Sequence, residues 1–303
     1  MAKKKIVYIA GYSRSGSTIL DILLGSHPDI FSTGELVYLF DDWLNNSRVC
    51  TCGEVYEKCS FWKNFKLPQE INFHEAVKVI RSVEARKQIN ALINEKIEEE
   101  VTRKYKLIQS ALYNYIFESS GKNIVVDSSK NSRDMAGRFF ALHRYTEFDI
   151  YVIHLIKNGL SIVESFVKKG RNWTLEGYGK NDRFAAARSS MGWFLANTLT
   201  ERLGKQMPQK KFIQIKYEEL LNHPENTLHT ISHLLDIDIS EVIDLIKNKA
   251  PLNAKHNVGG NRLRLEKEIK FNTSNQLKEI KLSSYHRLIF NLIGGRLNKR
   301  FGY

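Results

Sequence analysis

Short runs of consecutive apolar residues, rich in valine and isoleucine, alternate along the chain with longer amphipathic stretches. Such runs are typical of strands that are buried on both faces of a sheet. Strands that alternate with helices predict βαβ units, in which the strands are parallel and helices cover both faces. We therefore predict an α/β fold of three layers with a central parallel sheet, whose strands cover residues 5–11, 123–129, 149–156 and 211–217.

The region between the first two predicted strands is much longer than a simple crossover requires. From about residue 75 to residue 118 apolar residues recur at roughly helical spacing and many other positions are charged, which is typical of helices with a solvated face. No internal repeat or low-complexity linker divides the chain. We expect residues 36–118 to form a mostly helical insertion over the sheet, within one domain that spans residues 1–303.

The segment GYSRSGST follows the first predicted strand and precedes a helical pattern. It matches the phosphate-binding pattern G-x-x-x-x-G-K-[ST], except that Ser17 replaces the lysine and the cation, Arg14, lies in mid-loop. The lysine normally reaches the β- and γ-phosphates of a nucleoside triphosphate, whereas a mid-loop arginine suits a shorter anion. Backbone N–H groups at such a strand-to-helix turn favour an anion. We expect a P-loop-like site at Arg14, Ser15, Gly16, Ser17 and Thr18; the alternative is a Gly/Ser-rich turn without a ligand.

A second candidate anion site lies in the segment HLIKNGLSIVES, at the end of the third predicted strand. Lys157 ends that strand, and Ser165 lies on the next predicted helix, after an Asn-Gly turn. A cation and a hydroxyl in these positions can hold a second phosphate, although a surface lysine and an ordinary helix serine give the same pattern. Two anion sites at the carboxyl edge of one parallel sheet suit a nucleotide with phosphates on both its 5′ and 3′ sides.

The charge balance points to anionic partners. The 303 residues include 46 Lys and Arg against 33 Asp and Glu, a net charge of +13, which attracts a nucleotide, an acidic polymer or a membrane surface. The lysines at residues 3–5 are too few for a basic arm, and we expect no nucleic-acid partner. The chain has no run of 18 apolar residues and no signal-peptide pattern, which favours the cytoplasm. We expect its basic amphipathic tail to form a last packed helix, with peripheral contact with a membrane as the alternative.

Three cysteines, Cys50, Cys52 and Cys59, lie close together in the segment CTCGEVYEKCSFW. A structural zinc site has four ligands, and no fourth cysteine or histidine lies nearby in the sequence. An odd number of cysteines also argues against a complete set of disulfides. The pattern therefore favours a structural turn with reduced thiols over a metal site.

Three segments, GYSRSGST, KNGLSIVES and YEELLNHPENTLHTISHLLDID, together resemble a known family in their order and spacing. This family comprises the sulfotransferases that use 3′-phosphoadenosine 5′-phosphosulfate (PAPS), and the similarity is greatest to the branch of tyrosylprotein, carbohydrate and bacterial sulfotransferases. It spans residues 5 to about 238. The resemblance implies that the first loop holds the 5′-phosphosulfate and that Lys157 and Ser165 hold the 3′-phosphate. The family usually has an arginine where Lys157 stands, so the charge is kept and the bidentate guanidinium is lost.

The resemblance also implies which residues perform the chemistry, without a metal. Glu35 stands where the tyrosylprotein branch has its catalytic glutamate, which takes the proton of the acceptor; helix capping is the alternative. Lys130 matches a lysine that the family places near the sulfuryl group, although it could be an ordinary strand-end surface lysine. Arg14 would stabilise the leaving phosphate. The segment HNVGGNRLR resembles the loop that closes over the nucleotide and would bring Arg262 to it, or is a plain basic surface loop.

We therefore expect an enzyme that transfers a sulfuryl group from PAPS to the hydroxyl or amine of a carbohydrate, lipid, peptide or small molecule. Residues 36–118 and 177–199 should shape the acceptor pocket. Two other functions fit parts of the pattern. One is a P-loop kinase for a small molecule, for which Asp127 is the one candidate magnesium ligand near a strand end. The other is a non-catalytic protein that binds polyanions through its net charge.

Overall fold

A parallel sheet of five strands, in the order β2-β3-β1-β4-β5, forms the centre of the molecule. The computed structural model describes residues 4–131, 135–168, 184–266, 268–271 and 279–303. The strands are β1 (Lys5–Ala10), β2 (Ile30–Ser32), β3 (Ile124–Asp127), β4 (Asp149–Ile156) and β5 (Phe212–Lys216). Four of them confirm the strands predicted from the apolar runs, and β2, which has only three residues, was not predicted.

The apolar runs form strands because both faces of the sheet are covered. On β1 the side chains of Val7 and Ile9 pack into one core, and those of Ile6 and Tyr8 pack into the other. All four are fully buried. β1 pairs with both β3 and β4, and all of these pairings are parallel. The carboxyl ends of the strands therefore meet at one edge, where the candidate site residues lie.

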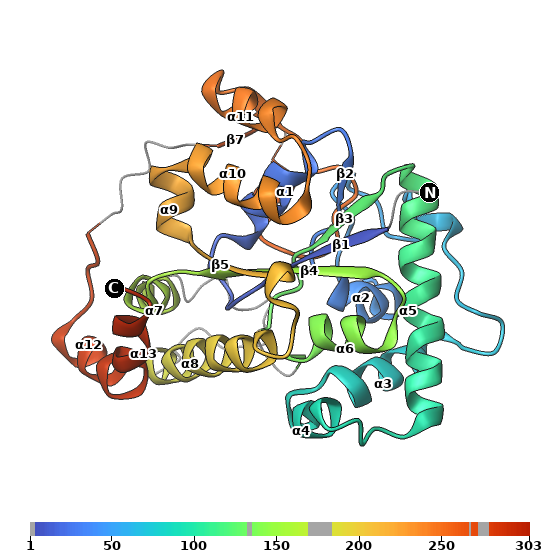
Figure 1. The fold of residues 1–303 in the computed structure, drawn as a ribbon, viewed down its shortest axis with the longest axis horizontal. Helices are drawn as coiled ribbons and strands as arrows, with labels where there is room; N and C mark the ends of the chain where they lie inside the picture. The colour runs from blue at the N-terminus through green and yellow to red at the C-terminus, as the bar shows by residue number, and fades with distance from the viewer. Residues whose placement is uncertain (1–3, 132–134, 169–183, 267, 272–278) are drawn as a thin grey trace.

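Helices cover both faces of the sheet and complete the three layers (Figure 1). On one face lie α1 (Ser17–Gly25), α9 (Tyr217–Asn222), α10 (Pro224–Leu235) and α11 (Ser240–Lys247). On the other face lie α3 (Phe73–Glu84), α5 (Glu99–Ser120), α6 (Arg138–Tyr145) and the end of α8 (Ala185–Gly204). The predicted α/β fold with a central parallel sheet is confirmed.

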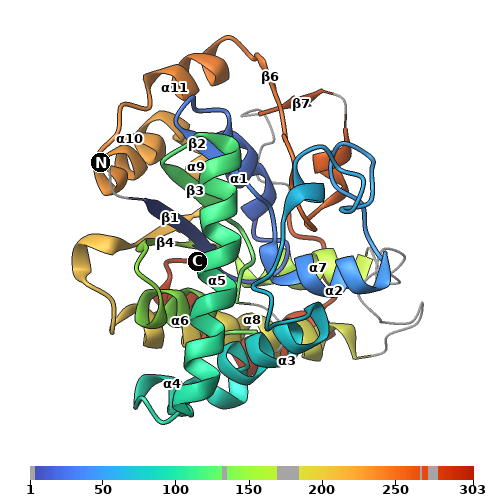
Figure 2. The ribbon, with the colours of Figure 1, turned by 90° about the vertical axis from the view of Figure 1, so that its right-hand side faces the viewer.

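The insertion between β2 and β3 is mostly helical, as predicted, and is interrupted by irregular segments. It contains η1 (Leu36–Tyr38), α2 (Leu39–Asn45), η2 (Trp62–Asn64), α3, η3 (Arg86–Gln88), α4 (Ile89–Ile93) and α5. The backbone of Ala85 is extended, and this ends α3. Residues 46–61 form turns and irregular structure instead of a helix. In Figure 2, α5 runs along the side of the molecule from the level of β2 to that of α4.

A third cluster of buried side chains lies beyond the carboxyl ends of β4 and β5. It joins α7 (Gly159–Lys168) and α8 to the C-terminal helices, which are α12 (Ser284–Phe290), the π-helical turn η7 (Asn291–Gly295) and α13 (Arg296–Arg300). The remaining elements are η5 (Gln209–Lys211), η6 (Arg262–Leu265) and a two-stranded antiparallel ribbon of β6 (Pro251–Leu252) and β7 (Ile269–Lys270). Among the helices of the described residues, none has the length and apolar character needed to cross a bilayer.

Candidate active site

Residues 11–18, between β1 and the first turn of α1, have the backbone of an anion-binding turn. We call these residues the phosphate loop. Gly16 caps the N-terminus of α1 with a φ of 94°, and Arg14 also has a positive φ, of 69°. A Cβ atom at Gly16 would lie 2.2 Å from ring carbons of Tyr217, so a larger residue does not fit. This close approach and the left-handed backbone explain the glycine. The N–H groups at the start of α1 are thus exposed to the loop, where they favour an anion.

Polar groups of the same loop are buried. Ser15 and Ser17 are buried, with 2% and 3% of their surface exposed. Ser15 Oγ and Arg14 Nε are buried atoms without a hydrogen-bond partner among the described residues. Buried polar groups normally have partners, and a loop that leaves two donors unsatisfied is suited to a polar ligand. Arg14 reaches towards α7, where its Cζ atom lies 5.3 Å from the ring centroid of Phe166, the residue after Ser165.

Glu35 and Lys130 form a buried ion pair beside this loop. Lys130 Nζ donates to Glu35 Oε1, and the two residues are 6% and 7% exposed. Glu35 precedes η1, but its side chain makes no capping hydrogen bond, and Lys130 is not on the surface. The side chain of Glu35 is therefore not a helix cap, and Lys130 is not a surface lysine at a strand end. Ser129 Oγ accepts a hydrogen bond from the backbone N–H of Val37, at 3.0 Å, so the two segments are also joined beside the pair.

A buried polar network holds the Lys130 segment. Asp127 Oδ2 accepts hydrogen bonds from Arg138 Nε at 2.9 Å and from Tyr113 Oη at 2.7 Å. Asp127 Oδ1 accepts from the backbone N–H and the hydroxyl of Ser129. Arg138 also donates to Glu84 at 2.7 Å, and the pKa of Glu84 is raised by its burial despite this cation. The network was not predicted, because Glu84 and Arg138 lie in helical stretches where charged residues are usually solvated. Both oxygens of Asp127 are engaged by these residues, which leaves it poorly suited as a magnesium ligand.

Lys157 and Ser165 lie on the two sides of the β4–α7 turn. Lys157 Nζ lies 4.3 Å from the ring centroid of Tyr217, the same ring that abuts Gly16. The backbone N–H of Gly159 donates to Asn298 Oδ1 at 2.9 Å, and that of Asn158 donates to Glu218 Oε1 at 3.2 Å. These amides already have acceptors, so an anion at this turn depends on side chains.

Tyr217 was not predicted as a site residue. Its signal in the sequence is an aromatic residue at the end of the last predicted strand, at the carboxyl edge of the sheet. It separates the phosphate loop from Lys157, and burial raises the pKa of its hydroxyl.

The segment HNVGGNRLR packs against the phosphate loop and Glu35. Val258 forms a parallel bridge with Gly34, and its carbonyl accepts a hydrogen bond from the backbone N–H of Glu35 at 2.6 Å. A Cβ atom at Gly260 would lie 3.6 Å from Thr18 Oγ1 and 3.7 Å from Glu35 Oε1. The late part of the chain therefore contacts both the phosphate loop and Glu35 at this glycine. We call residues 256–264 the late loop. Arg262 in this loop is exposed, whereas Arg264 is buried and donates to backbone carbonyls.

A sequence model described as the sulfotransferase family matches residues 7–241, more than three quarters of the chain. The chain belongs to the sulfotransferase family. Solved sulfotransferases share its fold. The sulfotransferase domain from the olefin synthase of Synechococcus PCC 7002 is 20% identical, with a TM-score of 0.56 over 99% of this chain and 95% of that domain. The sulfotransferase domain from the curacin biosynthetic pathway is 18% identical, with a TM-score of 0.56 over 98% of each chain. A sulfotransferase from Mycobacterium avium is 12% identical, with a TM-score of 0.51 over 100% of this chain and 78% of that one. No curated protein sequence matches the chain significantly.

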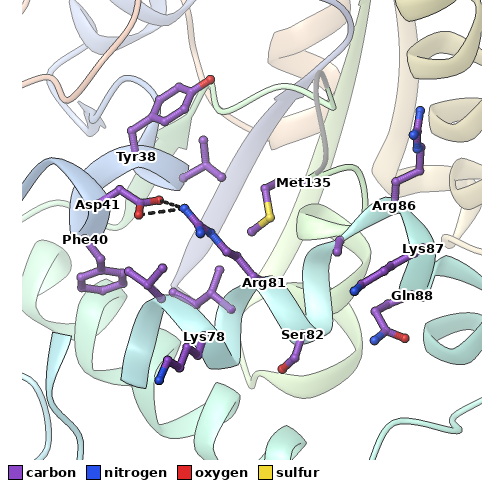
Figure 3. A pocket seen from close by; sticks show the side chains of 14 residues that line it. Tyr38, Phe40, Asp41, Lys78, Arg81, Ser82, Arg86, Lys87, Gln88 and Met135 are labelled. Atoms are coloured by element: carbon purple, nitrogen blue, oxygen red, sulfur yellow. Dashed lines mark hydrogen bonds and ion pairs between the residues drawn. The ribbon is translucent and has the colours of Figure 1, made fainter. Parts of the chain in front are cut away.

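The sulfotransferase has a pocket of about 890 Å³ next to the Glu35 and Lys130 segments (Figure 3). It lies between the segment after Glu35, helix α3 and Met135, which follows the Lys130 turn. Residues 177–183 were expected to shape an acceptor pocket together with the insertion, but they lie outside the described residues. The charged side chains that line the pocket are Asp41, Lys78, Arg81, Arg86 and Lys87. Arg81 donates both to Asp41 Oδ1 and to Asp41 Oδ2 at 2.9 Å, which leaves the pocket with an excess of positive charge.

Proposed function

We propose that the sulfotransferase transfers a sulfuryl group from PAPS to a hydroxyl or amine acceptor, as one domain that spans residues 1–303. The observation that carries the proposal is the buried Glu35–Lys130 pair beside a phosphate loop with unsatisfied donors. Together with the missing lysine at Ser17, this arrangement suits a phosphosulfate better than a nucleoside triphosphate.

The residues of the phosphate loop fit the 5′ end of the donor. PAPS supplies an electrophilic sulfur and a phosphate as leaving group. The backbone N–H groups at Gly16, Ser17 and Thr18 and the hydroxyl of Ser15 would hold its 5′ oxygens. Arg14 would stabilise the negative charge that grows on the bridging oxygen as the S–O bond breaks.

Lys157, Ser165 and Arg262 would hold the 3′-phosphate side of the donor. Lys157 has a single ammonium group where the family usually has a guanidinium, and the backbone amides at this turn are occupied. The grip on the 3′-phosphate therefore rests on side chains alone.

Glu35 would act as the general base and Lys130 as the cation that faces the sulfuryl oxygens. The acceptor oxygen forms a bond to sulfur while its proton passes to Glu35 and the bond from sulfur to the phosphate oxygen breaks. In the structure Lys130 is paired with Glu35. For the reaction, the ammonium group of Lys130 would turn from the Glu35 carboxylate towards the sulfuryl group. The same movement would free Glu35 to accept the proton and would bring a cation to the charge on the sulfuryl oxygens. The products are the sulfated acceptor and adenosine 3′,5′-bisphosphate.

The pocket of Figure 3 would receive the acceptor. Its lining includes Val37 and Tyr38, which follow Glu35 in the chain, and Met135, which follows Lys130 by five residues. Lys78, Arg86 and Lys87 give it a positive character. We therefore favour an acceptor that carries a carboxylate, phosphate or sulfate group near its reacting hydroxyl or amine.

Calorimetry in magnesium-free buffer without a chelator tests the donor site. Adenosine 3′,5′-bisphosphate should bind at least tenfold more tightly than AMP and more tightly than ATP. A preference for ATP that appears only when magnesium is added to the buffer would support a kinase instead. Equal, strongly salt-dependent binding of all three nucleotides would support a non-catalytic polyanion-binding protein. Turnover of labelled PAPS with a panel of anionic and neutral acceptors then tests the transfer itself.

A further inference from the structure

Three cysteines and one histidine from distant parts of the chain meet outside the active site. Cys50, Cys52 and Cys59 lie in the irregular part of the insertion, and His256 begins the late loop, some 200 residues further on. The three sulfur atoms and one imidazole nitrogen all lie within 4.8 Å of one another. The fourth ligand that the sequence pattern lacked is therefore supplied by the fold.

Three of the six distances between these atoms are known individually, and they match the edges of a zinc tetrahedron. Zinc lies about 2.3 Å from thiolate sulfur and about 2.0–2.1 Å from imidazole nitrogen. In a regular tetrahedron these bonds place two sulfur atoms ~3.8 Å apart and sulfur and nitrogen ~3.5 Å apart. In the structure Cys52 Sγ lies 3.6 Å from Cys59 Sγ. His256 Nδ1 lies 3.6 Å from Cys50 Sγ and 3.3 Å from Cys59 Sγ.

The surroundings hold the four groups in this arrangement. Backbone N–H groups of Phe61 and Trp62 face Cys59 Sγ, and that of Cys52 faces Cys50 Sγ. The His256 ring stacks on Phe61, with centroids 5.4 Å apart and an interplanar angle of 15°. Outer contacts of this kind orient the ligands of metal sites and donate hydrogen bonds to thiolates.

Three further hydrogen bonds tie the cysteine segment to the start of the late loop and to Lys255 before it. Trp62 Nε1 donates to the carbonyl of His256 at 2.9 Å. The Thr51 hydroxyl donates to the carbonyl of Lys255 at 2.6 Å and accepts from the backbone N–H of Asn257 at 3.0 Å. The backbone around the four groups is therefore fixed independently of their side chains.

We propose that Cys50, Cys52, Cys59 and His256 bind one zinc ion as a closed structural site. Four protein ligands leave no open position for a substrate or a water, so this metal takes no part in the transfer reaction. A disulfide would use two of the sulfurs and leave the third cysteine and the histidine without a role. The proposal replaces the reduced-thiol turn favoured by the sequence pattern, and it does not depend on the identity of the donor or the acceptor.

The metal would fasten the late loop over the active site. Immediately after His256, Asn257 Nδ2 donates to Asp21 Oδ2 at 2.6 Å, and Val258 pairs with the backbone of Glu35. Gly260 then lies against Thr18 and Glu35. Loss of zinc would therefore loosen the loop that borders Glu35, although no reacting group is removed.

The test begins with the wild-type protein, purified under reducing conditions without a chelator and analysed by elemental mass spectrometry. We expect about one zinc per chain. Replacement by Co²⁺ should give the intense visible bands of tetrahedral cobalt together with a thiolate charge-transfer band. Less than about 0.1 zinc per chain after exposure to zinc would overturn the proposal. So would a cobalt spectrum without thiolate bands, or an intact mass that reveals a disulfide in protein purified without reductant.

A matched pair of histidine variants tests the ligand from the late loop. His256→Asn should lower zinc affinity at least 100-fold, whereas His229→Asn, at an exposed position on α10, should leave it unchanged. Equal zinc affinity in both variants would contradict the role of His256. Hydrogen exchange of the wild-type protein gives a readout that does not require a folded variant: removal of zinc should speed exchange at residues 256–264 more than in the sheet. Unchanged protection of these residues would rule out the fastening role.

Discussion

At the scale of single residues, the pairing of Glu35 with Lys130 assigns the two halves of the reaction to different side chains. Glu35→Gln keeps the shape of the side chain and removes its basicity. It should lower kcat about 10²- to 10⁴-fold with an unactivated alcohol, the usual contribution of a general base, and leave the donor affinity nearly unchanged. Steady-state kinetics and calorimetry with adenosine 3′,5′-bisphosphate measure the two effects.

The variant Lys130→Ala is the comparison for this experiment. It should also lower kcat, because charge on the sulfuryl oxygens is left without a cation. A nitrophenol acceptor loses its proton readily and should partly rescue Glu35→Gln but not Lys130→Ala. Full activity of Glu35→Gln on an unactivated alcohol would show that Glu35 is structural.

The buried carboxyl group of Asp21, on α1, makes the free energy of unfolding depend on pH. It is fully buried and accepts hydrogen bonds from Ser32 and Asn257. Burial raises the pKa of this carboxyl from 3.8 to about 7. The folded protein therefore binds more protons than the unfolded chain between these values, and this contribution to the free energy of unfolding decreases as the pH rises from about 4 to about 7.

Asp21→Asn should remove that contribution, which amounts to at most about 4 kcal/mol across the interval. The measurement is the difference in unfolding free energy between wild type and variant as a function of pH. The contributions of the other titrating groups are the same in both proteins and cancel in this difference. His154, for example, acts in the opposite sense, since burial lowers its pKa to about 4. A constant difference between pH 4.5 and pH 7 would show that Asp21 titrates normally.

At the scale of elements, the strands were predictable and the contacts between distant loops were not. β1, β3 and β4 carry apolar runs because both of their faces are buried. β5, at the edge of the sheet, is only partly buried, and the three residues of β2 are too few for a recognisable pattern. The turn between β1 and α1 was predictable from its flanking strand and helix, and its role in phosphate binding stays a prediction. The meeting of Glu35 with Lys130, and of the cysteines with His256, depends on how loops far apart in sequence fold over the sheet edge, and no local pattern encodes it.

The proposed 3′-phosphate site at the turn between β4 and α7 can be tested by substitution of Lys157. The amides of this turn at Asn158 and Gly159 already have side-chain acceptors, so recognition of a 3′-phosphate depends on Lys157 and Ser165. Lys157→Ala should reduce the preference for adenosine 3′,5′-bisphosphate over AMP by roughly 10- to 150-fold, the value of a charge-assisted contact. Lys168→Ala is the control, because Lys168 ends the same helix and pairs with Glu164. Equal effects of the two substitutions would place the 3′ site elsewhere.

Helix α3 and the turn after it supply the cations of the proposed acceptor pocket. The double variant Arg86→Ala/Lys87→Ala should raise KM for an acceptor with an anionic group by roughly 2- to 30-fold, because each exposed cation contributes about 0.2–1 kcal/mol. KM for a neutral acceptor and the donor affinity should stay the same. An identical change for neutral and anionic acceptors would mean that the substitutions act on the helix and not on the substrate.

At the scale of the whole molecule, the net charge of +13 is combined with an exposed apolar stripe on the C-terminal helices. Tyr285, Leu288 and Leu292 are 66%, 57% and 78% exposed, while Phe290 between them is fully buried. We expect the protein to sediment with vesicles that contain phosphatidylserine but not with neutral vesicles. Leu288→Ser/Leu292→Ser should abolish this binding without changing turnover of a soluble acceptor. Binding that survives these substitutions would be purely electrostatic and independent of the stripe.

The position of β1 in the sheet has a consequence for the synthesis of the chain. β1 leaves the ribosome before the other strands of its sheet, yet it lies at the centre of the sheet, between β3 and β4. Its partner Asp149–Ile156 follows about 140 residues later, which takes roughly 7–30 s at 5–20 residues per second. During that time the apolar segment KIVYIA has no second neighbour, and its edge is open to other chains. The yield of native protein should therefore depend on chaperones that shield nascent chains more than on the stability of the finished fold.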